Sequence, residues 1–298
     1  VIAANTINSD VDAGLVPRLV VYVDDNFPSE TLGAEPGFNG DCDADNITNS
    51  VPATAYGYDS FDNINAAYSA VGAGGEIIVC PGTYPTSNLD IAKTVELTCA
   101  FAGVDPMTSL SRGAETIITP NYTGIEPSQP GAPDRFIDIT ASNVIIDGCT
   151  IDGDNAAVST VYGATLNALT AFSLNPDVRT LVSMNNTNNV QLVNNILVES
   201  NSRGIQYFGT ANTTTANLVQ NNRIDRIGDQ GIIHFDAYPV SIFSNVISNT
   251  PLAIHYQNTY ANPAVSVVLQ DNTITLSPEN GFAGIWFNLM YQNTSPIT

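Results

Sequence analysis

The chain has 298 residues, in which 8 lysines and arginines face 29 aspartates and glutamates, giving a formal net charge of −21. Nucleic acids and anionic membrane surfaces are bound through basic patches, so this charge argues against both as partners. The sequence lacks an apolar run of the ~20 residues that a membrane-spanning helix needs, which argues against membrane insertion. Charged residues make up 12 % of the chain and Asn, Thr, Ser and Gly fill the other polar positions, as is typical of an extracellular or cell-surface β-protein.

Residues 1–57 are interpreted as an N-terminal extension with one strand, 20–23, and a loop, 27–57, rich in Gly, Pro, Asp and Asn. The loop carries carboxylates at alternate positions, Asp41, Asp43 and Asp45. Alternate carboxylates can converge on one hard cation, as in the first half of an EF-hand loop. We therefore predict calcium at these three residues. A solvated acidic loop is the alternative, because the glycine and the closing glutamate of that motif are missing.

A short helix is predicted at 61–71, where apolar residues recur at helical spacing behind the capping pair Asp59-Ser60. The glycines of 72–75 are expected to end it. Strands are predicted next at 76–80, 91–99 and 115–119. We expect the helix to cover the open N-terminal end of the sheets that follow and so to protect their edge.

Four cysteines, Cys42, Cys80, Cys99 and Cys149, fit an oxidising compartment and allow three pairings. Cys80 and Cys99 end similar apolar strands 19 residues apart. Strands at this spacing would be neighbours, so a Cys80–Cys99 disulfide is the expected pair. Cys149 is interpreted as a buried thiol.

The middle of the chain repeats one pattern five times between residues 142 and 274. Each copy alternates apolar and polar residues, turns at a polar corner and closes on an aliphatic residue, as in VQLVNNIL at 190–197. The corner residues are Cys149, Asn195, Asn222, Asn245 and Asn272, at spacings of 46, 27, 23 and 27 residues. This period indicates a solenoid whose coils stack at roughly 4.8 Å. Identical residues then lie above one another, so the asparagines are predicted to form an internal hydrogen-bonded ladder.

A second column of strands is predicted between the corners. Its members are the triplets 137–139, 182–184, 206–208, 233–235, 254–256 and 285–287. The inward stack is predicted to contain Ile139, Met184, Phe208, Phe235, Tyr256 and Phe287. The outward row is predicted to contain Asp138, Ser183, Tyr207, His234, His255 and Trp286. Two positions later, a further outward row would contain Thr140, Asn185, Gly209, Asp236, Gln257 and Asn288.

The outward rows are the predicted ligand-binding face. The candidate binding residues are Asp138, Tyr207, His234, Asp236, His255 and Trp286. Flat rings beside carboxylates and amides suit sugars, whose apolar faces stack on aromatic rings while their hydroxyls form hydrogen bonds. The alternative is a structural ladder, because aromatic residues favour strands and pair across them. A transition-metal pair at His234 and His255, or acid–base work by His234 with Asp236, is less well supported.

An insertion at 152–178 interrupts the repeat, and long loops on a rigid solenoid often carry function. It opens with Asp152-Gly153-Asp154-Asn155, close in sequence to Asp147. These residues are a second candidate cation site, and ordinary Asp-Gly turn chemistry is the alternative.

The repeat, the helix and the Pro-Gly-Thr-Tyr turn at 81–84 together resemble the right-handed parallel β-helix superfamily, which includes pectate lyases and many bacterial surface proteins. The resemblance implies an all-β fold, a parallel β-helix over 58–298 that continues or is capped beyond residue 298. It implies little about function, because this fold hosts enzymes, adhesins and structural fibres.

The motifs of pectate lyases and polygalacturonases are missing from this sequence, which favours a non-catalytic role. We expect an extracellular structural or adhesive protein that binds polysaccharide and assembles through its solenoid ends, head to tail, into a filament. The alternative is a β-helix lyase or glycoside hydrolase that acts on acidic polysaccharides.

Overall fold

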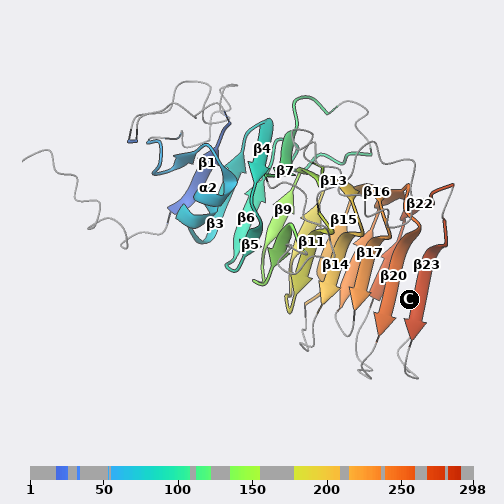
Figure 1. Cartoon of the computed structure of the whole chain (residues 1–298). Coiled ribbons are helices and arrows are strands. Elements are labelled where there is room, and N and C mark those ends of the chain that lie inside the picture. Colours follow the sequence, from blue (N-terminus) through green and yellow to red (C-terminus); the bar gives the residue numbers. More distant parts are fainter. Residues whose placement is uncertain are drawn as a thin grey trace, which may run out of the picture.

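Three parallel sheets wind along one axis in the computed structural model, which gives the structure of the protein (Figure 1). The structure describes residues 18–25, 32–33, 53, 55–107, 112–121, 135–154, 178–208, 215–235, 239–258, 267–278 and 281–289. The loop with Asp41, Asp43 and Asp45 lies outside these ranges, so the calcium prediction remains a prediction.

Each sheet is ordered by successive coils. Sheet A contains β2 (Ser60–Phe61), β1 (Arg18–Val23), β3 (Val71–Val79), β6 (Val95–Thr98), β9 (Ile145–Asp147), β12 (Gln191–Val193), β15 (Asn217–Gln220), β18 (Val240–Phe243) and β21 (Val267–Gln270). Sheet B contains β4 (Gly82–Thr86), β7 (Thr116–Pro120), β10 (Thr150–Asp152), β13 (Ile196–Ser200), β16 (Arg223–Ile227), β19 (Val246–Ser248) and β22 (Thr273–Thr275). Sheet C contains β5 (Leu89–Ile91), β8 (Ile137–Ile139), β11 (Thr180–Asn185), β14 (Arg203–Phe208), β17 (Gln230–Phe235), β20 (Leu252–Asn258) and β23 (Ala283–Leu289).

The fold is a right-handed parallel β-helix, as the resemblance implied, and its coils stack as the repeat predicted. One regular coil runs through a strand of sheet A, the asparagine corner, a strand of sheet B and a strand of sheet C, for example β12, β13 and β14. The sequence predicted two columns of strands per coil, whereas the structure has three sheets. The aliphatic residue that closes each repeat, such as Leu197 or Ile224, is the inward residue of a short strand in sheet B, paired in register with its neighbours.

The asparagine ladder is confirmed. The backbone N–H of Cys149 donates to Oδ1 of Asn195 at 2.9 Å, and the N–H of Asn195 donates to Oδ1 of Asn222 at 2.9 Å. The same bond joins Asn222 to Asn245 at 2.9 Å and Asn245 to Asn272 at 3.0 Å. Each bond satisfies a buried N–H that the corner removes from the sheet ladder.

The residue before each ladder position turns the chain. These residues adopt positive φ and are Gly148, Asn194, Asn221, Ser244 and Asp271. Glycine, asparagine and aspartate tolerate this left-handed conformation best, which explains why the corners read Asn-Asn or Asp-Asn in three of the coils.

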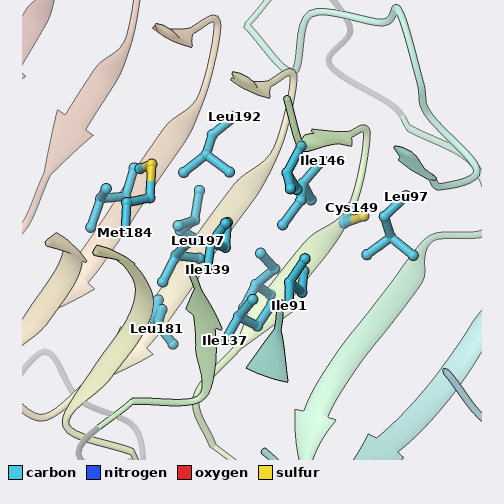
Figure 2. Packing of buried hydrophobic residues seen from close by; sticks show 14 of the residues in the cluster. Ile91, Leu97, Ile137, Ile139, Ile146, Cys149, Leu181, Met184, Leu192 and Leu197 are labelled. Carbon is cyan, nitrogen blue, oxygen red and sulfur yellow. The ribbon is translucent and has the colours of Figure 1, made fainter. Parts of the chain in front are cut away.

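Apolar residues fill the interior in stacked columns (Figure 2). In sheet A the column passes from Leu97 through Ile146 to Leu192, and in sheet C it passes from Ile91 through Ile139 to Met184. All six side chains are at most 1 % exposed. Full burial of such a side chain contributes roughly 1.5–3 kcal/mol, so every added coil extends one continuous core.

A helix covers the N-terminal end of the solenoid, as predicted, but it is shorter than expected. Helix α2 spans Ile64–Ala70, and its N-cap is Asn63, whose side chain accepts from the N–H of Ala66 at 2.8 Å. The expected capping residue Ser60 lies instead in strand β2, which pairs with β1 in sheet A. Strand β1 also pairs with β3, so the sheet reaches back into the N-terminal extension. Among the described residues, no helix is long and apolar enough to span a membrane.

The expected disulfide was wrong. Cys99 forms a disulfide with Cys149, the ladder residue of the next coil, and Cys80 is disulfide-bonded elsewhere. Strands β6 and β9 are neighbours in sheet A and bring the two Cα atoms within 5.0 Å of each other. Cys149 is therefore not a free thiol.

Candidate functional site

The outward side of sheet C carries one half-buried side chain per coil in a straight line, here called the outer row. Its members are Asn185, Phe208, Phe235, Gln257 and Asn288. The rings of Phe208 and Phe235 stack with centroids 4.9 Å apart and planes 5° apart. The row thus presents an amide, two rings and two further amides along the solenoid axis, without a charged side chain of its own.

Two guanidinium groups flank the rings of the outer row. Arg135 lies 5.3 Å from the ring centroid of Phe208 and forms an ion pair with Asp138 at 3.0 Å. Arg203 lies 5.6 Å from the ring centroid of Phe235 and donates to the side-chain oxygen of Gln206. Each arginine is therefore held by a polar partner while its Cζ lies over an aromatic ring, a favourable cation–π arrangement.

A second outward line lies two residues upstream and is mostly buried. It passes through Asp138, Ser183, Gln206, Ile233, His255 and Trp286. Asp138, His255 and Trp286 therefore share one row, as predicted. Trp286, in the last described strand, is 39 % exposed, whereas His255 is 4 % exposed.

His255 is held by its neighbours on both sides. Its ring stacks on Trp286 with centroids 4.5 Å apart, and its Nδ1 lies 3.1 Å from Nε2 of Gln230. Burial, with a smaller contribution from Arg203, lowers the pKa of His255, so the ring is neutral near pH 7.

Tyr207 and His234 point inward, which corrects their predicted placement. In the structure Met184 pairs with Tyr207, Tyr207 with His234, and His234 with Tyr256. Both residues are 1 % exposed, and the His234 ring lies 5.6 Å from Tyr207 and 4.9 Å from Tyr256 between ring centroids. Neither side chain faces a ligand on the surface. Asp236, the last candidate of this set, lies outside the described residues.

The predicted alternation of inward and outward residues was shifted by one residue in two coils, those of β14 and β17. The stretches Gly-Ile-Gln-Tyr-Phe and Gly-Ile-Ile-His-Phe each contain apolar residues in both phases, so alternation alone does not fix which residues point inward. The structure places Phe208 and Phe235 where Gly209 and Asp236 were expected. It keeps Asn185, Gln257 and Asn288 in the same row as predicted.

A cluster of carboxylates surrounds one arginine near the C-terminal ends of strands β10, β13 and β16 of sheet B, where the predicted insertion begins. We call it the acidic cluster, and it contains Asp152, Asp154, Glu199, Asp225 and Arg226. Arg226 forms ion pairs with Glu199 and, at 2.6 Å, with Asp225. Oδ1 of Asp225 also accepts from Ser248 and Asn249, each at 2.7 Å.

Burial shifts the pKa of three carboxyl groups in this cluster. It raises the pKa of Asp152 to about 6, and it raises the pKa of Asp154 and Glu199 as well, although Arg226 opposes the shift at Glu199. Oε2 of Glu199 is buried without a hydrogen-bond partner within the described parts of the chain. A carboxyl group with a pKa near 6, as at Asp152, can give and take a proton close to neutral pH.

Sequence reasoning named Asp152 and Asp154 but missed Glu199, Asp225 and Arg226. All five residues lie one to three positions after the inward aliphatic residue of sheet B, in three successive coils. Aligning the residues after Ile151, Leu197 and Ile224 would have shown the cluster. Asp147, which was grouped with Asp152 as a cation site, instead accepts from Asn194 at 2.8 Å and from the N–H of Gly103 at 3.1 Å.

Within the described ranges, no group of three or more His, Cys, Asp or Glu side chains is arranged to hold a metal ion. The acidic cluster offers carboxyl groups for proton transfer. The outer row offers ring edges and hydrogen-bonding amides at one-coil intervals.

The chain was compared with known families, curated proteins and solved structures. No family model matches the sequence, and no curated protein matches it. Among solved structures, the chain is similar to YbhC of Escherichia coli, with 14 % identity, a TM-score of 0.44 and coverage of 76 % of this chain and 72 % of that one. It is also similar to the pectin methyl esterase of the rice weevil, with 15 % identity, a TM-score of 0.47 and coverage of 74 % and 65 %. For the pectate lyase Pel9A the identity is 12 %, the TM-score 0.34 and the coverage 96 % and 82 %. At this level the similarity concerns the path of the chain, and function has to be argued from the residues.

Proposed function

We propose that this chain is the rigid module of an extracellular or cell-surface protein, with a structural or adhesive role, and that it binds polysaccharide along the outer row. The observation that supports this proposal is the regularity of the row. Asn185, Phe208, Phe235, Gln257 and Asn288 are half-buried, in register and one coil apart. A linear row of this kind suits a polymer with a repeating unit better than it suits a compact ligand.

The chemistry of the row favours a neutral glycan. Ring edges contact the C–H groups of a sugar, and amides exchange hydrogen bonds with its hydroxyls, as in other sites with a few placed polar groups. A net charge of −21 repels a polyanion, whereas a neutral chain meets no such barrier. The guanidinium groups of Arg135 and Arg203 are already engaged with Asp138 and Gln206 and serve to fix the rings.

The extracellular location rests on the disulfide chemistry. The Cys99–Cys149 disulfide, and the disulfide-bonded Cys80, persist in an oxidising compartment and would be reduced in most cytosols. The low content of charged residues is consistent with the same location.

The test is affinity electrophoresis against a panel of soluble neutral and acidic polysaccharides, using the whole chain. We expect retardation by at least one neutral polymer, and the double variant Phe208→Ala/Phe235→Ala should bind roughly tenfold more weakly, a loss of about 1.4 kcal/mol. Tyr58→Ala is the control, because Tyr58 is an aromatic residue 44 % exposed and lies in the N-terminal part of the chain, before α2. Equal loss in both variants, or binding confined to polyanions, would contradict the proposal.

A second candidate function is a lyase or hydrolase of acidic polysaccharides, and the acidic cluster favours it. Asp152 with a pKa of about 6 is suited to proton transfer, and Arg226 holds Glu199 and Asp225. The assay is incubation with acidic polysaccharides, read as absorbance of unsaturated products or as new reducing ends. Turnover that is lost in Asp152→Asn but kept in Phe208→Ala would replace the binding proposal with this one.

A further inference from the structure

The corner between sheets B and C carries a long charged residue in two successive coils. Equivalent positions at this corner are occupied, coil after coil, by Gly153, Glu199, Arg226 and Asn249. The last three adopt φ values of 56°, 55° and 49°. Asparagine tolerates this left-handed conformation, whereas glutamate and arginine adopt it at a cost. The turn itself therefore does not account for the charged pair.

The downstream side of the acidic cluster, around Asp225, is well supplied with hydrogen-bond donors. Asp225 forms an ion pair with Arg226 at 2.6 Å and accepts from Ser248 and Asn249, each at 2.7 Å. Arg223 lies 3.9 Å from the same carboxylate and is half exposed. The positive charge of the cluster is thus concentrated around Asp225.

The upstream side of the cluster, formed by Asp152, Asp154 and Glu199, differs. The Glu199 side chain is 5 % exposed, and its Oε1 forms an ion pair with Arg226. Its Oε2 is buried and has no hydrogen-bond partner within the parts of the chain that the structure describes. Burial raises the pKa of Glu199, and repulsion from Asp152 and Asp154 adds to the shift. A buried carboxylate oxygen that faces two further carboxyl groups calls for a cationic donor.

The other basic residues of the chain lie elsewhere. Besides Arg223 and Arg226, the lysines and arginines are Arg18, Lys93, Arg112, Arg135, Arg179 and Arg203. Of the described basic side chains, Arg226 is the one that lowers the pKa of Asp152 and Glu199, against the larger effect of burial. The link 155–177, which follows Asp154, has no lysine, arginine or histidine in its sequence. The positive charge that the upstream side lacks therefore has to come from a ligand.

Arg226 shows which kind of cation fits this corner. Its Nε donates to Glu199 and its Nη1 to Asp225, so one guanidinium bridges carboxylates in two neighbouring coils. Asp152 flanks Glu199 from the coil before, as Asp225 flanks it from the coil after, because both aspartates pair in register with Val198. A guanidinium is planar, carries five N–H donors and is more weakly hydrated than an ammonium group, which suits partly buried carboxylates.

We propose that the upstream side of the acidic cluster binds the guanidinium group of a ligand, which bridges Oε2 of Glu199 and the carboxylate of Asp152. Two sources carry this group, an arginine side chain of a partner protein and a free small guanidine. The site lies before the first residue of β14, whereas Phe208 of the outer row is the last residue of that strand. The proposal is therefore independent of polysaccharide binding, and it needs no turnover.

The experiment is isothermal titration calorimetry of the whole chain with N-acetyl-arginine amide, and with N-acetyl-lysine amide as a probe of equal charge. The arginine probe should bind, and the lysine probe should bind roughly tenfold more weakly, because an ammonium group lacks the planar fork. Agmatine and the peptide Gly-Gly-Arg-Gly-Gly distinguish the sources. Tighter binding of the peptide supports a partner protein, and tighter binding of agmatine supports a small guanidine.

Glu199→Gln should weaken binding of the arginine probe by at least about tenfold, because a charge-assisted hydrogen bond is lost. Asp152→Asn should weaken it similarly and leaves both ion pairs of Arg226 in place, so it decides the question if Glu199→Gln folds poorly. Asp90→Asn is the matched control, since it removes an exposed carboxylate in β5 and changes the net charge equally.

Three results would overturn the proposal. The first is the absence of binding by the arginine probe to the unaltered chain. The second is equal affinity for the arginine and lysine probes, which indicates attraction by the net charge of −21 alone. The third is an equal loss of binding in Asp90→Asn and Asp152→Asn.

Discussion

Replacing Asn222 by leucine tests the asparagine ladder at its centre. Asn222 is fully buried, and its Oδ1 accepts from the N–H of Asn195 at 2.9 Å and from Nδ2 of Asn195 at 3.1 Å. Its Nδ2 donates to the carbonyl of Leu192 at 2.8 Å, to that of Gln220 at 3.0 Å and to Oδ1 of Asn245 at 3.0 Å. Leucine has a similar volume and can make none of these bonds.

The expected loss in the free energy of unfolding depends on which hydrogen bonds the partners of Asn222 keep. Nδ2 of Asn195 still donates to the carbonyl of Ile146 at 2.9 Å, and Oδ1 of Asn245 still accepts from the backbone N–H of residue 222 at 2.9 Å. The N–H of Asn195 loses its acceptor and the carbonyl of Leu192 loses one donor. At about 1–3 kcal/mol for each orphaned buried group, the free energy of unfolding should fall by roughly 2–5 kcal/mol.

The assay is thermal and denaturant unfolding followed by circular dichroism, with Asn185→Leu as the matched control. Asn185 is an asparagine of the outer row two coils earlier, and its Oδ1 accepts an exposed bond from Asn186 at 2.9 Å. That control should change the free energy of unfolding by no more than about 0.5 kcal/mol. Equal losses in the two variants would show that the ladder adds nothing beyond ordinary side-chain packing and would refute the reasoning.

Three further predictions concern pH, the disulfide and calcium. Burial raises the pKa of Asp152 from 3.8 to about 6, so the folded state holds this proton more tightly than the unfolded state. The free energy of unfolding should therefore fall by about 2–3 kcal/mol as pH rises from about 4 to about 6. Urea titrations of Asp152→Asn should show a weaker dependence of this free energy on pH, and an unchanged dependence would contradict the shift. Cys99→Ser should lower stability by about 4 kcal/mol, since the bond to Cys149 closes a loop with a sequence separation of 50, and a loss under about 1 kcal/mol in denaturant melts would contradict this estimate. If the 41–45 carboxylates bind calcium, chelation should speed limited proteolysis of 27–57, and cleavage that is the same with and without chelator would remove the idea.

The repeat made the interior of the fold predictable. Identical residues at the corner recur because each one bonds to the next, so Asn195, Asn222, Asn245 and Asn272 can be aligned without a structure. The same logic located sheet A and sheet C. The regular strands of sheet B were missed because they follow the corner directly and do not alternate. In β13 and β16 consecutive residues are buried, so a search for period-two alternation does not register them.

The disulfide shows the limit of arguments from spacing. Cys99 has a neighbour on each side in sheet A, β3 and β9, and spacing favoured the one 19 residues away over the one 50 residues away. Sequence distance is the wrong measure in a solenoid, because a coil with a long insertion still stacks at the same height. Cys99 and Cys149 lie in adjacent coils although their sequence separation is 50.

A solenoid also changes what a binding site requires. In most folds a site is assembled from distant segments, whereas here any outward position repeated once per coil becomes a line on the surface. The inward half of each strand is fixed by packing, as with Met184, Tyr207 and Tyr256, and the outward half remains available for contacts. In the outer row these outward positions carry side chains that exchange hydrogen bonds or offer ring edges. A ligand that gains from every added coil must itself extend along the axis, and that is the physical reason to look for a polymer on this face first.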